Sequence, residues 1–363
     1  MEKELSKLGK KRKRRKRIRS VLWGIAAVLV IAGISIYAVH QFGKNALKNK
    51  TEQEMEMESE KPITAEEAEE GIVYYNDEKY RYNYEILTFL FMGIDNDDSF
   101  KDEEAMGTAG QADCNFLAVM DVKNKTLELI GISRDTITDI SIYGADGEYI
   151  RTVQEHLAIQ FAYGDGAAKS CEMMVGAVSN LMYGLPIHGY CAINWDGVAV
   201  LNDAIGGVEV TVLEDLTWID KTLIEGETVT LKGKHAFNYV KVRNLKVFAS
   251  NNLRIQRQKQ YLKAYANKML AKTKKDITVP LTVLQKLDNY MITDVSLDQI
   301  TYLASELLNY QIDFENIHVI EGEVVHPEGS KYEEFHVDYE ALYELILEIF
   351  YEKVPEKTEE MMN

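Results

Sequence analysis

The stretch Leu127-Glu128-Leu129-Ile130-Gly131-Ile132-Ser133-Arg134-Asp135 decides the fold of this chain. Its apolar residues are those of a buried β-strand, which stops where Arg134 and Asp135 begin. In layered α/β domains, strand ends fix functional groups in place while the adjoining loops expose them. We therefore expect this pair to form one wall of a functional site. The alternative is a surface ion pair, worth about 0 to 1 kcal/mol.

Three strand-like runs open the domain, at 85–93, 115–121 and 126–133. The last two are separated by a turn of four residues, which is short enough for an antiparallel hairpin. If the hairpin is centred on the middle of this turn, opposing residue numbers sum to 247. Asp113 is then expected to face Arg134, although the two are distant in sequence.

The end of the first strand brings a further carboxylate to this edge. Asp95 follows that strand, and the polar loop 96–112 must return the chain to the start of the second strand. Because an antiparallel neighbour begins where the first strand ends, we expect Asp95 near Asp113 and Arg134. Carboxylates beside an arginine suggest Mg²⁺ together with a phosphate, since both prefer these ligands. The alternative is a solvated acidic rim.

Charge divides the chain sharply. The first 50 residues carry 14 Lys/Arg and two acids, whereas the rest carries 27 Lys/Arg and 56 Asp/Glu, a net charge of −29. Ten of the basic residues lie between Lys7 and Arg19, directly before the uncharged residues 21–39. At about 1.5 Å per residue, such a helix nearly spans a hydrocarbon core of about 30 Å. We therefore expect a basic tail, 1–20, and a transmembrane helix, 21–39.

The orientation of this anchor follows from the positive-inside rule, which places the basic tail in the cytoplasm. A secretory signal peptide is the alternative, because it also has a basic start and an apolar stretch. The apolar stretch is long for a signal peptide, and no clear small-x-small cleavage site follows residues 37–40. We expect a single-pass protein of the cell membrane whose C-terminal domain is extracytoplasmic.

The exterior part divides into three segments. Residues 40–84 are rich in glutamate and poor in large apolar side chains, so we expect an acidic extracytoplasmic linker. Residues 85–352 have the length and apolar content of one domain, and 353–363 form a C-terminal tail. The three cysteines allow at most one disulfide, and the seven histidines form no zinc-binding pattern.

A second group of polar residues lies further along the chain. Lys241 and Arg243 are two apart in the strand-like run 239–243, and Arg254 and Gln258 are four apart in a following helix, so each pair shares a face. Gathering cations in an acidic domain indicates an anionic ligand between them. The alternative is a basic helix face paired with nearby acids. We expect no nucleic-acid partner, because the exterior is acidic and no aromatic platforms alternate with these cations.

Seven stretches follow one another in a recognisable order and spacing: Phe91-Met92-Gly93-Ile94-Asp95, Gly110-Gln111-Ala112-Asp113, Ile132-Ser133-Arg134-Asp135-Thr136, Phe161-Ala162-Tyr163-Gly164, Ile193-Asn194-Trp195-Asp196-Gly197, Ala204-Ile205-Gly206-Gly207-Val208 and 243–258. In these stretches the chain resembles the LytR-CpsA-Psr family of cell-wall enzymes, from about Leu87 to about Tyr351. Each stretch is weak alone, but their combination is specific. The N-terminal anchor also agrees with the single-span architecture of the family.

The resemblance implies an α/β fold, an α-β-α sandwich with a central mixed β-sheet, preceded by one transmembrane helix. It also implies a phosphotransferase that moves a teichoic acid, capsule or other glycopolymer from an undecaprenyl-pyrophosphate carrier onto peptidoglycan. By this resemblance Asp95 and Asp113 would hold Mg²⁺, with Mn²⁺ as the alternative ion. The implied pyrophosphate ligands are Arg134, Lys241, Arg243, Arg254 and Gln258, and the implied catalytic residues are Arg134, Asp135, Arg243 and Arg254.

Two positions depart from the family pattern. Lys241 stands where an arginine is usual, so the charge is kept but the bidentate fork is lost. Asn251 stands where an aspartate is common, and an amide cannot act as a general base. Three hypotheses follow: a Mg²⁺-dependent glycopolymer transferase, a non-catalytic protein that binds lipid-linked polymer as a scaffold, and a hydrolase of the lipid pyrophosphate.

Overall fold

The computed structural model describes residues 40–47, 71–96, 100, 109–144, 146–244 and 250–355, with the backbone alone at 251, 252 and 311–316. The predicted basic tail 1–20 and transmembrane helix 21–39 lie outside these ranges, as does most of the predicted tail 353–363. Within them, no helix combines the length and the apolar character needed to cross a membrane.

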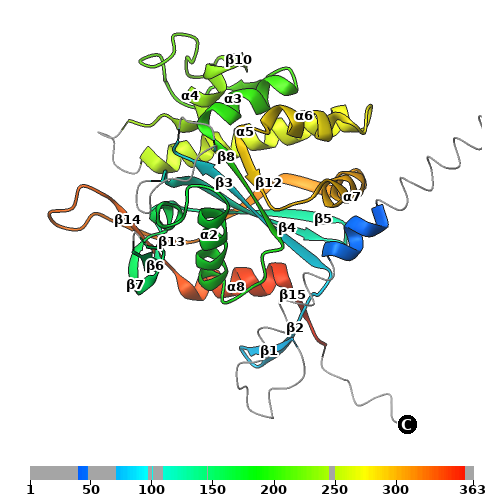
Figure 1. Cartoon of the computed structure of the whole chain (residues 1–363), viewed down its shortest axis with the longest axis vertical. Coiled ribbons are helices and arrows are strands. Elements are labelled where there is room, and N and C mark those ends of the chain that lie inside the picture. The colour runs from blue at the N-terminus through cyan, green and yellow to red at the C-terminus, as the bar shows by residue number, and fades with distance from the viewer. Residues whose placement is uncertain are drawn as a thin grey trace, which may run out of the picture.

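A mixed sheet forms the centre of the molecule (Figure 1). In spatial order its strands are β11 (Met291–Thr293), β8 (Gly189–Asn194), β3 (Ile86–Ile94), β4 (Ala112–Asp121), β5 (Thr126–Ile132) and β12 (Gln311–Val319). The pairs β3–β4, β4–β5 and β8–β11 are antiparallel, whereas β3–β8 and β5–β12 are parallel. The prediction of an α/β fold with a central mixed sheet is confirmed.

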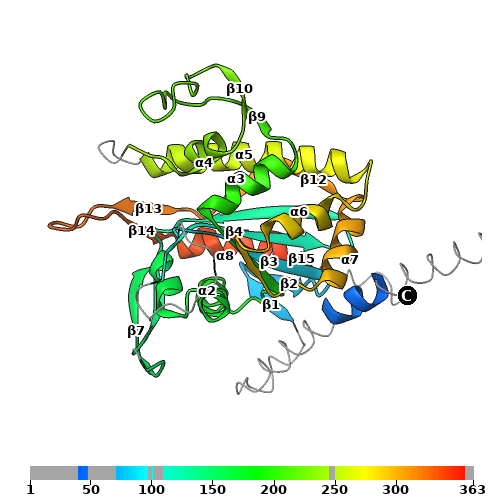
Figure 2. The same cartoon turned by 45° about the horizontal axis from the view of Figure 1, so that its top comes forward.

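Helices cover both faces of this sheet, as Figures 1 and 2 show. They are α2 (Ala168–Leu181) and α8 (Tyr339–Phe350) on one face, and α5 (Ser250–Thr273) and α7 (Leu297–Leu307) on the other. Alternate residues of β4 serve the two cores: Leu117 and Val119 pack with α2 and α8, while Phe116 and Ala118 pack with α5. Burial on both faces explains why β3 and β4 are almost continuously apolar.

A second core lies on the α5 side of the sheet (Figure 2). Its elements are α3 (Trp195–Ala204), β9 (Val208–Thr211), β10 (Thr228–Leu231), α4 (Lys234–Lys241) and α6 (Val279–Leu287). The prediction of a strand over 239–243 is wrong, because α4 continues to Lys241. Ala236, Tyr239 and Val240 are the buried residues of this helix, a spacing that favours helix over strand.

Two further hairpins flank the end of β5. They are formed by β6 (Ile137–Tyr143) with β7 (Tyr149–His156), and by β13 (Gly322–Val325) with β14 (Glu334–Val337); η1 (Leu157–Tyr163) follows β7. A bridge between Thr136 and Phe335 joins the second hairpin to the residues after β5. Both hairpins therefore stand beside the Arg134 and Asp135 turn.

Part of the predicted linker, 40–84, is folded. Within it, β1 (Ile72–Tyr75) and β2 (Glu78–Tyr82) form a three-stranded sheet with β15 (Tyr351–Lys353). Tyr82 is buried in the main core, and its ring contacts those of Tyr84 and Tyr351. The glutamate-rich composition before position 71 concealed this tyrosine-rich hairpin, whose third strand, β15, is distant in sequence. The folded domain therefore includes residues before 85.

Candidate functional site

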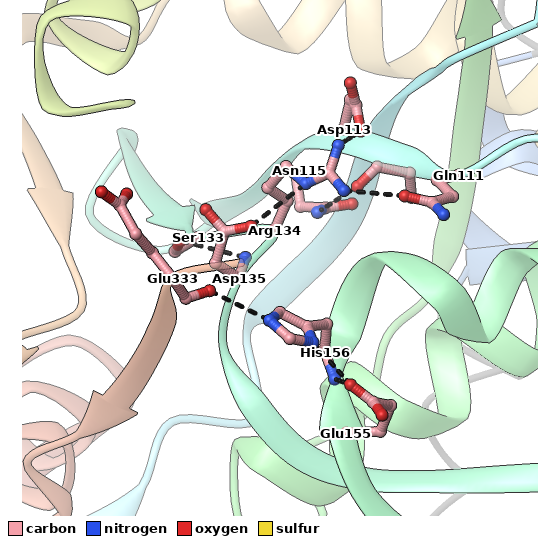
Figure 3. Close-up of polar contacts among 10 residues, drawn as sticks. Gln111, Asp113, Asn115, Ser133, Arg134, Asp135, Glu155, His156 and Glu333 are labelled. Atoms are coloured by element: carbon pink, nitrogen blue, oxygen red, sulfur yellow. Dashed lines mark hydrogen bonds and ion pairs between the residues drawn. The ribbon is translucent and has the colours of Figure 1, made fainter. Parts of the chain in front are cut away.

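The β4–β5 hairpin has the predicted register. Asn115 lies opposite Ile132, and the same register places Asp113, at the start of β4, opposite Arg134, which follows the end of β5. Arg134 Nη1 donates a hydrogen bond to Asp113 Oδ1, and Nη2 donates to Gln111 Oε1 at 2.7 Å (Figure 3). The guanidinium is thus held by two acceptors from the segment that enters β4.

The turn that carries Arg134 is fixed by backbone hydrogen bonds from three segments. The amide of Thr136 donates to the carbonyl of Ser133 at 3.2 Å, which closes the turn. The carbonyl of Arg134 accepts from Ala158 N at 3.1 Å, and that of Asp135 accepts from Phe335 N at 2.8 Å. Asp135 Oδ1 also forms an ion pair with Arg134 Nε at 3.3 Å. This ion pair places the Asp135 carboxylate against the guanidinium of Arg134.

Asp113 is the buried carboxylate of the site, with 7% of its surface exposed. Burial raises the pKa of Asp113 above its ordinary value, because the charged form is poorly solvated. Arg134 and Arg254 oppose this shift. Asp95 and Asp135 add to it, so their charges also reach Asp113. Three carboxylates therefore converge here, as the hairpin and loop arguments predicted.

Arg254 forms the opposite wall, from the first turns of α5. It is 5% exposed, and burial lowers the pKa of its guanidinium from the ordinary value. Asp113 opposes this shift, whereas the positive charges of Arg243 and Arg134 add to it. The predicted arginines Arg134 and Arg243 are thus both close enough to Arg254 to repel it, and such an arrangement favours an anionic ligand.

Asp95 stands at the mouth of the site, with 47% of its side chain exposed. Its backbone amide donates to the carbonyl of Gln111 at 2.8 Å. Its Oδ1 accepts from Trp195 Nε1 at 2.6 Å and from Lys241 Nζ at 3.3 Å. Lys241, predicted as a pyrophosphate ligand, therefore lies beside the predicted metal ligand Asp95, with its ammonium over the rings of Trp195 and Phe237.

Two neighbouring residues of α5 hold the end of α4. Gln258 Nε2 donates to the carbonyl of Val240 at 3.1 Å, so this predicted pyrophosphate ligand has a structural partner. Arg257 is fully buried and donates to the carbonyls of Tyr239 and Val242, and its Nε pairs with Glu214 at 2.8 Å. These contacts satisfy carbonyls that a helix end leaves without partners. They also fix the end of α4, and with it the positions of Lys241, the last residue of the helix, and Arg243, which follows it.

A small, partly open hollow lies between the two walls. Its lining residues are Asp113, Cys114, Asn115, Phe116, Gly131, Ile132, Ser133, Arg134, Arg254, Ile255, Gln258 and Val319. The charged residues of this lining are Asp113, Arg134 and Arg254, and its large apolar side chains are Phe116, Ile132, Ile255 and Val319. This mixture of arginines and apolar side chains suits an amphiphilic ligand with an anionic head and an apolar tail.

Other residues of the site were not assigned a role from the sequence. Gln111, Trp195 and Arg257 lie within the stretches that resemble the family, but their roles are recognisable only through contacts made across the fold. His156 is another, placed at the end of β7 beside the Arg134 turn (Figure 3). Its Nδ1 lies 2.5 Å from Glu155 Oε1, and its Nε2 lies 3.0 Å from the carbonyl oxygen of Glu333. It thereby links the two flanking hairpins.

The donor set fits a hard divalent cation. Asp95 and Asp113 offer carboxylate oxygens from adjacent strands, and the negative charges that converge on Asp113 leave a cation favoured there. Among the described residues, no group of three or more His, Cys, Asp or Glu side chains could hold a metal by itself. Mg²⁺ commonly uses one or two carboxylates and completes its shell with phosphate and water.

Fold and site together define an α/β protein built to hold a strongly anionic group at the edge of a mixed sheet. The LytR_cpsA_psr family model matches residues 36–345, so the chain belongs to the LytR-CpsA-Psr family. A relative from Enterococcus faecalis, the polyisoprenyl-teichoic acid–peptidoglycan teichoic acid transferase TagU, is 25% identical over 303 residues, which cover 82% of this chain and 85% of that protein.

Solved structures show the same fold. The crystal structure of Bacillus subtilis TagV has a TM-score of 0.54 and 21% identity, and the match covers 72% of this chain and 94% of that one. A structure of TagT bound to LI-WTA also has a TM-score of 0.54, with 20% identity over 73% of this chain and 89% of that one. The central mixed sheet is therefore shared with these proteins.

Proposed function

We propose that this protein is a membrane-anchored transferase that moves a glycopolymer from an undecaprenyl-pyrophosphate carrier onto peptidoglycan. The observation that carries the proposal is that Arg134 and Arg254 line one hollow with the buried Asp113, while the charge of Arg243 also acts on Arg254. The family and the name of the E. faecalis relative support the same reaction class.

The substrate fits the site through its charge and its shape. A pyrophosphate placed between the β5 turn and α5 would neutralise the arginines that now repel one another. The apolar part of the hollow, with Phe116, Ile132 and Val319 in its lining, would take the first part of the prenyl tail. Aqueous anions lack such a tail, so this division favours a lipid pyrophosphate.

The proposed reaction exchanges one phosphorus–oxygen bond for another. A hydroxyl of peptidoglycan attacks the phosphorus that carries the polymer, and the bond from this phosphorus to the bridging oxygen breaks. Undecaprenyl phosphate leaves, and the hydroxyl proton passes to solvent. Negative charge develops on the bridging and equatorial oxygens, where fixed guanidinium groups stabilise it more than they stabilise the ground state.

Arg134 and Arg254 would carry this stabilisation, because both are largely buried and Arg134 is held by Asp113 and Gln111. Asp135 keeps the guanidinium of Arg134 in orientation. Asp95 and Asp113 would hold Mg²⁺, or Mn²⁺ in its place. When bound, this ion would neutralise phosphate charge and polarise the phosphoryl oxygens.

The proposal also includes location. With residues 1–20 in the cytoplasm and 21–39 in the membrane, the domain would face the extracytoplasmic side, where peptidoglycan is the acceptor. The carrier lipid would reach the site from the same membrane.

The test uses the full-length chain in detergent micelles with a lipid-pyrophosphate-linked sugar and peptidoglycan oligomers, with and without Mg²⁺. Transfer of sugar to peptidoglycan that requires the ion supports the proposal. Release of phosphate without transfer would identify a hydrolase of the lipid pyrophosphate instead. Tight binding of the lipid with neither product would identify a scaffold that holds lipid-linked polymer.

A further inference from the structure

Trp195 lies beside Asp95 because two parallel strands end together. In the β3–β8 pair, Ile94 lies opposite Asn194, so the next residues along the two strands are Asp95 and Trp195. The indole Nε1 donates a hydrogen bond to Asp95 Oδ1 at 2.6 Å. This contact joins the start of α3 to the mouth of the site.

The indole is itself held firmly. Trp195 is 2% exposed and begins α3, whose N-cap Asn194 accepts a hydrogen bond from the amide of Gly197 at 2.9 Å. A side chain at Gly197 would come within 2.5 Å of Ile193 Cγ2, so the first turn of α3 packs directly on β8. The ring also makes an edge contact with Phe237, with centroids 5.5 Å apart.

Unlike the Trp195 indole, the side chain of Asp95 is not packed in the protein interior. It follows the last residue of β3, and 47% of its side chain is exposed, so its carboxylate would otherwise sample several rotamers in water. The same Oδ1 that accepts from the indole also accepts from Lys241 Nζ, which lies 4.7 Å from the centre of the Trp195 ring. One indole therefore orders an anion at its edge and a cation on its face.

We propose that Trp195 is a positioning residue that holds the carboxylate of Asp95 ready for a divalent cation. This inference rests on the proposed function, because it takes Asp95 as a ligand of Mg²⁺. Hydrogen bonds that orient a metal-binding carboxylate typically change metal affinity by about 10- to 100-fold when they are removed. Trp195 is then required for cation binding although it touches no phosphate or metal itself.

The first experiment measures Mg²⁺ binding to the full-length chain by titration calorimetry. Trp195→Phe keeps an aromatic ring against Phe237 and Lys241 but removes the Nε1 donor. We expect this variant to bind Mg²⁺ about 10- to 100-fold more weakly. The matched control is Trp218→Phe, whose ring is 54% exposed, and it should bind as the wild type does. Unchanged affinity in a folded Trp195→Phe protein would overturn the proposal.

The second experiment needs no metal and keeps Trp195 in place. In protein labelled with ¹⁵N-tryptophan, the Trp195 indole resonance should move and exchange faster with water in Asp95→Ala, while the Trp218 resonance should not change. If the wild-type protein binds no Mg²⁺, the metal is not part of the proposed function. The contact between Trp195 and Asp95 is then tested by the indole resonance: a shift in Asp95→Ala supports the contact, and an unchanged resonance overturns it.

Discussion

Arg134 donates a hydrogen bond to Asp113 across the open end of the β4–β5 hairpin, although the two residues are 21 positions apart in sequence. The pairing of Asn115 with Ile132 fixes this contact, since the ladder continues in the same register. Asp113 holds one edge of the Arg134 guanidinium, and Arg134 also lines the hollow where a ligand would bind.

Replacing Arg134 should abolish most turnover without unfolding the protein. We expect Arg134→Ala to lower kcat by about 10²- to 10³-fold, the usual loss when a fixed donor to the developing charge is removed. Arg134→Lys should fall between this variant and the wild type, because lysine keeps the charge but not the fork. Turnover and circular dichroism measure the two effects.

The matched control for this series is Arg81→Ala, which removes an exposed arginine of β2. It should keep wild-type turnover. If Arg134→Ala and Arg81→Ala proved equally active, the proposed site would be wrong.

Replacing Arg257 should reduce stability strongly. Arg257→Met keeps much of the volume but leaves the carbonyls of Tyr239 and Val242 without their donor and Glu214 without its partner. We expect the free energy of unfolding to fall by about 3 to 5 kcal/mol, as for other broken buried ion pairs. Urea denaturation measures this loss.

Glu214→Gln serves as the comparison for Arg257, because it removes only the more exposed partner. It should cost less than Arg257→Met. Equal costs would indicate that the ion pair matters more than the two carbonyl contacts.

The acid dependence of stability should depend on Glu306. Burial disfavours its charge, but the hydrogen bond and charge of Lys125, together with His40, outweigh burial and hold the pKa of Glu306 below its ordinary value of about 4.5. A lowered folded pKa stabilises the protein above the ordinary value, and this contribution is lost as the pH falls below 4.5.

Glu306→Gln should therefore lose less stability than the wild type between neutral and acidic pH, by about 0.2 to 1 kcal/mol for a partly exposed pair. Thermal melting at a series of pH values measures the difference. Glu348→Gln, at an exposed position of α8, should retain the wild-type dependence. Parallel pH profiles for wild type and Glu306→Gln would contradict the assignment.

Restoring the family aspartate should increase turnover. Asn251 lies in the first turn of α5, one turn before Arg254. In Asn251→Asp a carboxylate could accept the proton of the attacking hydroxyl, so we expect a rate increase of up to about 10²-fold. Asn252→Asp adds the same charge to the same helix turn and should not raise the rate. Equal rates for both variants and the wild type would show that a base is not needed at position 251.

Local rules predicted much of the site. The short turn before Thr126 and the apolar runs on either side determined the β4–β5 register, and hence the meeting of Asp113 with Arg134. The position of Asp95 followed because an antiparallel strand must begin where its neighbour ends. Both arguments needed only strand periodicity and connection length.

The parts that were missed depend on contacts between distant segments. Arg257 looked like one more surface cation of a basic helix, and only the fold shows that it holds the end of α4. Tyr239 and Val240 suggested a strand from their type, whereas burial against the second core selected a helix. Strand β2 forms a local hairpin with β1, but this hairpin follows a glutamate-rich segment, and its packing on β15, near the other end of the chain, is visible only in the fold.

The small sheet of β1, β2 and β15 lies far from the proposed site. Its strand β2 leads into the start of β3, whose nine residues then run to the site at Asp95, a length of about 30 Å at about 3.3 Å per residue. The small sheet at the start of β3 and the proposed site at the end of β3 are therefore at opposite ends of the domain. For a protein anchored through its N-terminal segment, as we propose, an upright domain would hold the site well above the lipid headgroups. In such an anchored protein, the domain would have to lie along the membrane surface for a carrier lipid to enter the site.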